Sequence, residues 1–407
     1  MHVSKETELY MEFFTTKYTT NYNLDVNNDK FKSVIKMLYH DVIKGYTWAE
    51  SNFDELQVQL KKIDIISQIP QPDGFGSKYF SSEARKHILN NSQFTVSYKF
   101  QIEKRTIEVV FITPDDVSNQ TTRFDCYLKK IMSWIYIANH YSSVTCGTNM
   151  KLYIYLTKLK KELPNNRWDT IGEVHVNSGL SDICKRNSEI IIYREEEWFK
   201  VFVHETFHNY GLDFSIMNVD NHTSLLDNSF NVNSDFAMYE TYTEFWARMM
   251  NIVYCSYELD SSNSFNNFYM YFQILLYYER IYSLYQCIKV LHFMNLTYNE
   301  IIFKKYREKG KQLYRENTNV FSYYVGVAIL MINPIAFVQH CVSKNMNIFR
   351  FKKTDAALKE FYDYFVSESK SRDTIKVFHG MNTLIKETPK NMLYSCRMTI
   401  SDVDSCS

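Results

Sequence analysis

Two histidines and a glutamate near the middle of the chain have the types and the spacing of a metal site. Residues 201–210 read Val-Phe-Val-His-Glu-Thr-Phe-His-Asn-Tyr, so His204, Glu205 and His208 form a His-Glu-x-x-His pattern. On a helix, side chains four residues apart share a face, which lets both imidazoles reach one ion. Zinc lowers the pKa of a bound water to about 7, and Glu205 could then take its proton. The pattern therefore predicts one Zn²⁺ ion held by His204 and His208, with Glu205 as the catalytic base.

A catalytic zinc ion usually has three protein ligands, and the acidic pair Glu240 and Glu244 could supply the third. The two glutamates lie four residues apart in Tyr-Glu-Thr-Tyr-Thr-Glu-Phe-Trp-Ala, so they share one face of a predicted helix. Their aromatic neighbours argue against a fully solvated acidic face. We expect Glu240 to bind the metal and Glu244 to orient a ligand histidine from behind. Glu244 itself is a second possibility for the ligand.

Asp213 is a further alternative for the third ligand. The stretch His208-Asn-Tyr-Gly-Leu-Asp resembles the metzincin pattern His-Glu-x-x-His-x-x-Gly-x-x-His, with Gly211 at the glycine that ends the helix. The last ligand of that pattern would fall on Phe214, which cannot bind zinc, and Asp213 lies one residue early. In the plainer interpretation, Gly211 ends the helix and Asp213 hydrogen-bonds to nearby backbone.

Strands are expected before the motif and helices after it. Alternating apolar residues predict a hairpin over residues 94–100 and 107–111. The other expected strands cover residues 152–156, 172–177 and 189–194. The expected helices cover most of residues 1–65 and then residues 121–140, 195–210, 266–294, 299–317, 321–337 and 354–369. The motif helix should carry acidic residues in its first turn, because the helix dipole favours them there.

The bulk composition restricts the partners and the location. The 407 residues carry 46 Lys and Arg against 46 Asp and Glu, so no net charge attracts nucleic acid or anionic lipid. The 8 cysteines form no Cys-x-x-Cys pair, which favours reduced, mostly buried thiols. The first residues lack the apolar stretch of a signal peptide, and no apolar run is long enough to span a bilayer. We therefore expect a soluble intracellular (cytoplasmic) protein that binds neither nucleic acid nor membrane.

The surroundings of the motif resemble the gluzincins, which are peptidases with His-Glu-x-x-His and a downstream helical glutamate. The likeness covers about residues 94–251, and the segment that begins at Glu240 resembles the glutamate helix of the anthrax lethal factor type. The resemblance implies that His204, His208 and Glu240 bind zinc, that Glu205 is the base, and that Glu244 stands behind a ligand.

The same resemblance implies an α+β fold with a zincin-like catalytic core, made of a small mixed sheet and the active-site helix. With a boundary at the Pro- and Gly-rich residues 69–76, we expect this core to span residues 77–260. Predominantly helical regions would flank it at residues 1–76 and 261–407.

The implied activity is zinc-dependent hydrolysis of peptide bonds in a peptide or protein substrate. An extended substrate would pair with an edge strand beside the cleft, for which residues 175–178 are the candidate by position. An oxyanion stabiliser is also expected near the metal. The candidates for it are Tyr239, Tyr242, His175 and His222.

A second resemblance concerns origin. The block from Val176-Asn-Ser-Gly to the motif is similar to His-Glu-x-x-His proteins of large DNA viruses, and the abundance of Lys, Asn, Ile, Tyr and Phe agrees with an AT-rich genome. It implies that the chain acts in an infected host cell or is packaged in a virion. The rival hypothesis is therefore a non-enzymatic viral structural or scaffold protein that retains a zincin-like fold.

Overall fold

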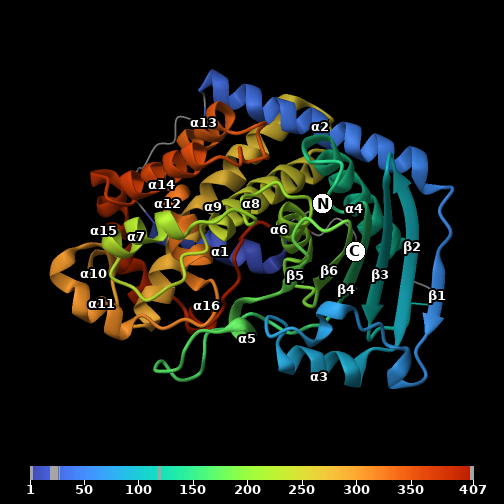
Figure 1. Ribbon diagram of the computed structural model, residues 1–407, viewed down its shortest axis with the longest axis horizontal. Coiled ribbons are helices and arrows are strands. Elements are labelled where there is room, and N and C mark those ends of the chain that lie inside the picture. The colour runs from blue at the N-terminus through green and yellow to red at the C-terminus, as the bar shows by residue number, and fades with distance from the viewer. Residues whose placement is uncertain (1–2, 19–25, 27, 118–120, 404–407) are drawn as a thin grey trace.

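A six-stranded mixed sheet forms one half of the protein in the computed structural model, which describes residues 3–18, 26, 28–117 and 121–403. The strand order is β1-β2-β3-β4-β6-β5 (Figure 1). β3, β4 and β6 pair parallel, and the other neighbours pair antiparallel. The strands are β1 (Gln59–Lys62), β2 (Phe94–Ile102), β3 (Arg105–Thr113), β4 (Asn149–Tyr155), β5 (Gly179–Ser181) and β6 (Asn187–Ile192). The expected α+β class is confirmed.

The β2–β3 hairpin was expected from the alternation of apolar residues, and the structure confirms it. Glu103 opens a two-residue loop in the left-handed conformation (φ 48°), as short hairpin turns require. Val109 faces the larger hydrophobic core, whereas Val110 faces a smaller core on the opposite side of the sheet. The smaller core is completed by residues 69–88, which include the start of α3 (Ser82–Asn91). The second half of β3 is apolar on both faces because both faces are covered there.

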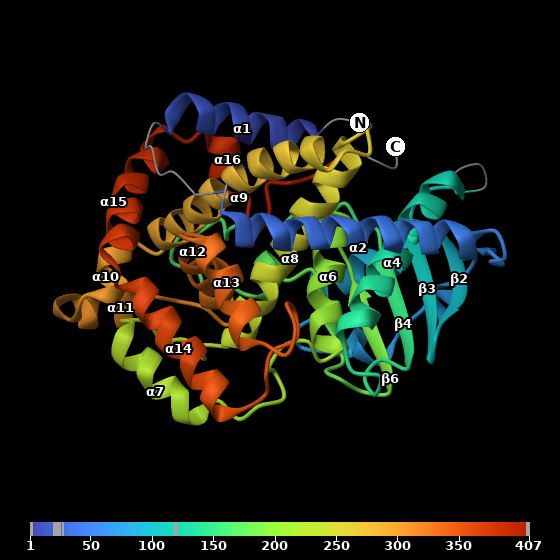
Figure 2. The same ribbon diagram turned by 90° about the horizontal axis from the view of Figure 1, so that it is seen from above.

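Three helices build the larger core against the sheet. They are α4 (Thr121–Tyr141), the motif helix α6 (Trp198–Asn209) and α2 (Asp29–Phe53), which lies across α4 (Figure 2). Gly45 allows the close approach of α2, because a Cβ atom there would lie 2.6 Å from the Oγ atom of Ser133 in α4. This packing fixes the position of α6 between the sheet and the helical half.

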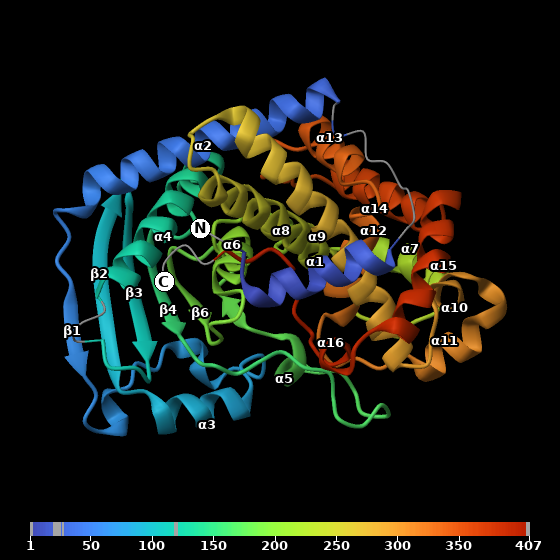
Figure 3. The same cartoon turned by 180° about the vertical axis from the view of Figure 1, so that it is seen from behind.

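The other half of the protein is helical (Figure 3). Helices α8 (Met238–Leu259) and α9 (Phe265–Phe293) pack on each other, and α1 (Lys5–Lys17) packs on α9. The expected helices over residues 266–294 and 354–369 are confirmed. The remaining elements of this half are α7 (Asp220–Ser229), α10 (Tyr298–Ile302), η3 (Lys304–Tyr306), α11 (Arg307–Leu313), η4 (Phe321–Gly326), α12 (Val327–Leu330), α13 (Pro334–Lys344), α14 (Asp355–Ser369), α15 (Arg372–Glu387) and α16 (Lys390–Leu393).

Residues 395–403, which we call the C-terminal strap, run without a helix through the middle of the molecule. The amide of Cys396 donates to the carbonyl of Lys161 (2.7 Å), and the Tyr324 hydroxyl donates to the carbonyl of Cys396 (2.6 Å). The strap ends beside the N-terminal segment, where Val3 and Val403 form a β-bridge. It therefore joins the sheet half to the helical half.

Two expectations for the sheet half are wrong. Residues 59–62 lie in the stretch expected to be helical, yet they form β1 because they pair with β2. Residues 172–177, expected as a strand, contain the short helix α5 (Glu173–Val176). There the Nδ1 atom of His175 accepts the amide hydrogen of Gly172 (3.0 Å), which favours a turn over an extended chain.

The helices expected over residues 299–317 and 321–337 are both broken. The side-chain amide of Asn231 donates to the carbonyls of Glu300 and Phe303, which a continuing helix would use, and α10 ends there. The second helix stops before Asn333, whose side chain caps α13. Among the described residues no single helix has the length and apolarity to cross a bilayer, although the bent pair Phe321–Leu330 and Pro334–Lys344 (94°) passes on length and composition.

The cysteines that the structure describes differ in part from expectation, since Cys126, Cys146 and Cys184 are disulfide-bonded. Cys146 and Cys184 form a disulfide, so the prediction of reduced thiols is wrong for this pair. They lie in the loops before β4 and β6, which are parallel neighbours in the sheet. Because 38 residues separate them in the sequence, their spacing did not predict the contact. The free cysteines that the structure describes are buried, as expected: Cys255, Cys287, Cys341 and Cys396.

Candidate metal centre

Helix α6, which carries the motif, is buried at every residue. Glu197 precedes it in the left-handed conformation (φ 58°), so the acidic residues stand before the helix and not in its first turn, contrary to expectation. At the other end Gly211 (φ 61°) closes the helix as predicted. Its amide donates to the carbonyl of His208, and the amide of Leu212 donates to the carbonyl of Phe207.

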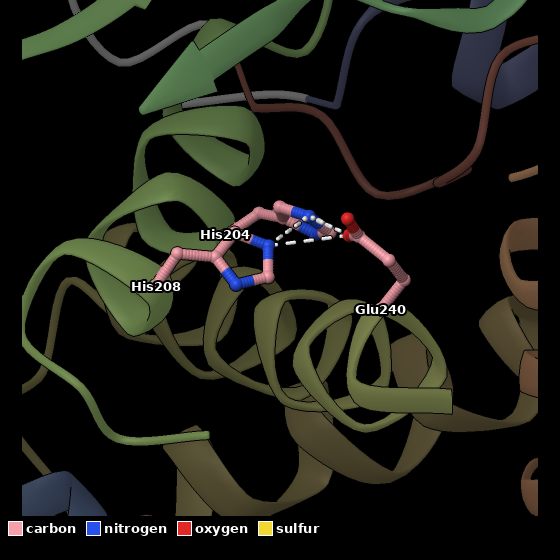
Figure 4. Close-up of side chains that lie close together, drawn as sticks. All are labelled: His204, His208 and Glu240. Atoms are coloured by element: carbon pink, nitrogen blue, oxygen red, sulfur yellow. Dashed lines mark hydrogen bonds and ion pairs between the residues drawn. The ribbon is translucent and has the colours of Figure 1, made fainter. Parts of the chain in front are cut away.

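Three side chains from α6 and α8 point at one spot (Figure 4). The Oε2 atom of Glu240 lies 3.0 Å from His204 Nε2 and 3.2 Å from His208 Nε2, and the two nitrogens lie 3.2 Å apart. In a tetrahedral zinc site with bonds of about 2.0–2.1 Å, neighbouring ligand atoms are roughly 3.3 Å apart. The three atoms therefore have the spacing of one face of such a tetrahedron and could hold a metal ion.

A carboxylate stands behind each imidazole. Glu244 Oε2 lies 2.9 Å from His204 Nδ1, and Asp213 Oδ2 is hydrogen-bonded to His208 Nδ1. Because a carboxylate accepts the Nδ1 proton, the lone pair of each Nε2 atom faces the centre. Two lone pairs and the carboxylate of Glu240 then meet in a buried place, where a positive charge would stabilise them.

The pKa shifts of these groups have the same origin. Burial alone would lower the pKa of His204 and His208, but the neighbouring carboxylates outweigh burial and raise it. Burial would raise the pKa of Glu240, yet the charge of His208 and the hydrogen bonds to both imidazoles hold it well below its usual range. The cluster thus favours positive charge at its centre, whether as protons or as a metal ion.

Asp213, the alternative ligand, lies behind His208 and not among the converging atoms. Its Oδ1 atom accepts hydrogen bonds from the hydroxyl (2.8 Å) and the amide (3.2 Å) of Ser215. The left-handed turn at Gly211 brings the carboxylate back beside the helix, next to the far nitrogen of the ring. This geometry suits a residue that orients a ligand.

Further polar contacts fix the two glutamates of α8. Lys200 Nζ lies 2.9 and 3.0 Å from the two carboxylate oxygens of Glu244, and Arg248 Nε lies 3.0 Å from one of them. Burial would raise the pKa of Glu244, but these two cations hold it well below its ordinary value. Asn319 donates to Glu240 Oε1 (3.2 Å), so the other oxygen of that carboxylate remains at the centre.

Glu205 lies beside the cluster without joining it. Its Oε2 atom accepts a hydrogen bond from the hydroxyl of Ser181 in β5 (2.8 Å). Burial raises the pKa of Glu205, although the two histidines act in the opposite direction. A buried carboxylate that is held in place, and is not itself a ligand, can take a proton and return it.

Tyr323 belongs to the site and was not expected from the sequence. Its ring centroid lies 6.0 Å from that of His204, and it lines one cavity together with His204 and Glu205. It stands on η4, a π-helical segment, which approaches α8 closely because a Cβ atom at Gly326 would collide with Thr241. Burial, with the charge of Glu240, raises the pKa of Tyr323 well above its usual value, so it carries a proton to donate.

Of the four residues expected as oxyanion stabilisers, one lies near the cluster. Tyr239 lies beside the cluster, with its ring centroid 5.9 Å from that of His208. The others are engaged elsewhere: the Tyr242 hydroxyl donates to the carbonyl of Phe349 (2.7 Å), His175 accepts from Gly172, and the ring of His222 packs on Tyr362.

No protein-family model, curated protein or solved structure matches this chain. The candidate centre therefore rests on its own geometry.

Proposed function

We propose that the chain is a zinc-dependent peptidase with a zincin-like core of the gluzincin type. The observation that carries the proposal is the geometry of three possible ligand atoms, which lie within 3.2 Å of one another. Glu205 lies beside them, bound to Ser181, and is not one of the ligands. Two imidazoles and one carboxylate are a donor set of catalytic zinc, whereas calcium and magnesium prefer oxygen atoms only. Such a donor set would leave a fourth position on a bound zinc ion for water or substrate.

The chain's own residues divide the proton transfers of the reaction. Zinc, when bound, would polarise the substrate carbonyl and acidify a water. Glu205 takes a proton from that water as the C–O bond forms, and it returns the proton to the amine nitrogen as the C–N bond breaks. Ser181 keeps the Glu205 carboxylate in position through its hydrogen bond. Tyr323 is the donor proposed for the carbonyl oxygen, where negative charge develops.

The free edge of β5 is where an extended peptide would pair. The carbonyl of Ser178 accepts the amide hydrogen of Tyr193, the residue after β6, and the amide of Asp182 donates to the carbonyl of Glu189 in β6. Backbone direction alternates along a strand, so Gly179 and Ser181 turn their amides and carbonyls outward. Residues 175–178 were expected in this role, but the edge strand begins only at Gly179, because the chain before it forms α5.

Zinc content and cleavage of a diverse peptide library test the proposal together. The wild type and Glu205→Gln should each hold about one zinc per chain, and His204→Ala should hold little. His222→Ala removes a histidine from α7 and serves as the matched control with full zinc and full activity. Only the wild type and this control should cleave, because loss of a general base costs about 10²–10⁴ in rate.

Two results would decide against the proposal. Full activity of Glu205→Gln would show that the mechanism is wrong. Zinc binding without cleavage by any variant would favour the rival, a non-enzymatic structural or scaffold protein of viral origin that keeps a metal on an inherited fold.

A further inference from the structure

A small cavity lies on the Glu205 side of the metal cluster. Its volume is about 30 Å³, and His204, Glu205 and Val201 of α6 line one side of it. The opposite walls include Ser178, just before the edge strand, and Met398 of the C-terminal strap. The cavity is therefore bounded by the motif helix, the residues around the start of β5 and the C-terminal strap.

The position of Glu205 decides which part of a substrate would face this cavity. Glu205 must reach the amine nitrogen to return its proton. The residue that contributes this nitrogen, which is the one after the scissile bond, therefore lies on the Glu205 side of the centre. Gly179 of β5 lines this cavity, so a substrate paired with that strand would place the residue after the bond beside it.

Resting on the proposed peptidase function, we propose that this cavity selects the residue after the scissile bond, and that Met398 restricts it to glycine, alanine or serine. A cavity of about 150 Å³ accommodates a benzene molecule, and one of about 10–15 Å³ a single water. The observed volume of about 30 Å³ is enough for one or two non-hydrogen atoms. Leucine or phenylalanine would need a wall to move.

Met398 is a firmly held wall. It is 4% exposed, and its amide donates to Glu197 Oε1 (2.8 Å). Glu197 is itself ion-paired with Lys161, and the side chains of both are fully buried. The sulfur of Met398 lies 3.6 Å from Lys200 Nζ. Moving the strap away would expose or break these buried contacts, so the cavity cannot widen at little cost.

The charges at the cavity exclude ionised side chains. Lys200 is already paired with Glu244, and Lys161 with Glu197, so neither lysine is left to neutralise an entering carboxylate. The hydroxyl of Ser178 is different, because it has no hydrogen-bond partner among the described residues although Ser178 is only 5% exposed. A serine hydroxyl in the cavity could satisfy it, which adds serine to the two smaller residues.

Paired peptides test the inference on the full-length, zinc-loaded protein. The two peptides share a site that the wild type cuts and differ only in alanine or leucine after the bond. The wild type should show a kcat/KM at least tenfold higher for alanine. Met398→Ala and Val201→Ala open the same cavity from two sides, and each should reduce that ratio at least tenfold. Met392→Ala, which removes a buried methionine of α16 that does not line the cavity, should leave the ratio unchanged.

Binding of hydroxamates separates this inference from the proposed function. A hydroxamate chelates zinc and needs no cleavage, and a pair of inhibitors can carry a methyl or an isobutyl group at the same position. If no peptide is cut, yet the methyl compound binds at least tenfold tighter and Met398→Ala removes the difference, the peptidase function is wrong, but the size selection by the Met398 wall stands. If peptides are cut with equal rates for alanine and leucine, or both cavity variants keep the wild-type ratio, the inference is wrong. Failure to bind zinc would overturn both.

Discussion

Replacing Glu240 by alanine should release zinc far more readily than replacing Asp213. Glu240 Oε2 lies at the centre, 3.0 and 3.2 Å from the two Nε2 atoms, whereas Asp213 is linked to the centre only through the far nitrogen of His208. The first substitution removes one of three ligands. The second keeps all three ligands but leaves the His208 ring without the partner that sets its orientation.

The expected magnitudes follow from these positions. Zinc sites in small proteins bind with apparent free energies of about 10–16 kcal/mol. One of three ligands then represents roughly 4 kcal/mol, which is close to a thousandfold in Kd. A lost carboxylate behind a ligand histidine costs about 10–100-fold. Asp213→Asn, whose amide oxygen can still accept the Nδ1 proton, should stay at the low end of that range.

Competition with a chromogenic zinc chelator at neutral pH measures the zinc affinity of the wild type and of each variant, with circular dichroism to verify folding. Asp220→Ala, in the first turn of α7, is the control for loss of an aspartate outside the centre. The order of retention should be wild type and control, then the two Asp213 variants, then Glu240→Ala. If Asp213→Ala lost the metal while Glu240→Ala kept it, Asp213 would be the ligand and the gluzincin assignment would fail.

Three further predictions concern stability. Chelation of zinc should lower the Tm in calorimetry, since a ligand at a thousand times its Kd stabilises the folded state by about 4 kcal/mol; an unchanged Tm would exclude a tightly held ion. Lys161→Met should cost about 3–5 kcal/mol in urea unfolding because it leaves buried Glu197 unpaired, and adding Glu197→Gln should recover most of the loss, which no independent effect of the two residues would do. Burial lowers the pKa of Lys289 from 10.5 to about 7, so the unfolded chain binds more protons between these two values. The free energy of unfolding should therefore rise with pH in that window, by up to about 1.4 kcal/mol per pH unit from this lysine, and should not depend on it below the window. Equal slopes of the free energy of unfolding against pH for the wild type and Lys289→Met would refute this.

The elements that the sequence predicts well are those whose cause is local. Apolar alternation defines the β2–β3 hairpin, and long aromatic-rich segments without proline or glycine define α9 and α14, because each signal lies within the element itself. The failures occur where a distant residue decides. The side-chain amide of Asn231 donates to the carbonyls that a longer α10 would use, and no residue near position 300 indicates this contact in the sequence. β1 is exposed at every residue, and it is a strand only because β2 offers its edge.

The candidate site also contains some residues that local sequence patterns predict and others that only distant packing brings together. His204 and His208 share a face of α6, and Glu240 and Glu244 share a face of α8, so spacing along one helix predicts each pair. The place of Asp213 depends on a turn whose direction spacing does not give. Tyr323 and Met398 have no sequence relation to the motif, and only the packing of η4 against α8 and of the C-terminal strap against α6 brings them to it.

Under the proposed function, zinc binding and substrate selection would depend on different parts of the chain. The ligands come from α6 and α8, whose contact is made within residues 198–259. One wall of the selecting cavity comes from the strap, which is tied to α6 through the amide of Met398 and the carboxylate of Glu197. The region expected to begin at residue 261 thus supplies Tyr323 and Met398 to a centre whose ligands all precede it. A fragment that ended there would keep the three proposed ligands and lose both, so, under the proposed function, substitutions in the strap should change which peptides are cut while the metal remains bound.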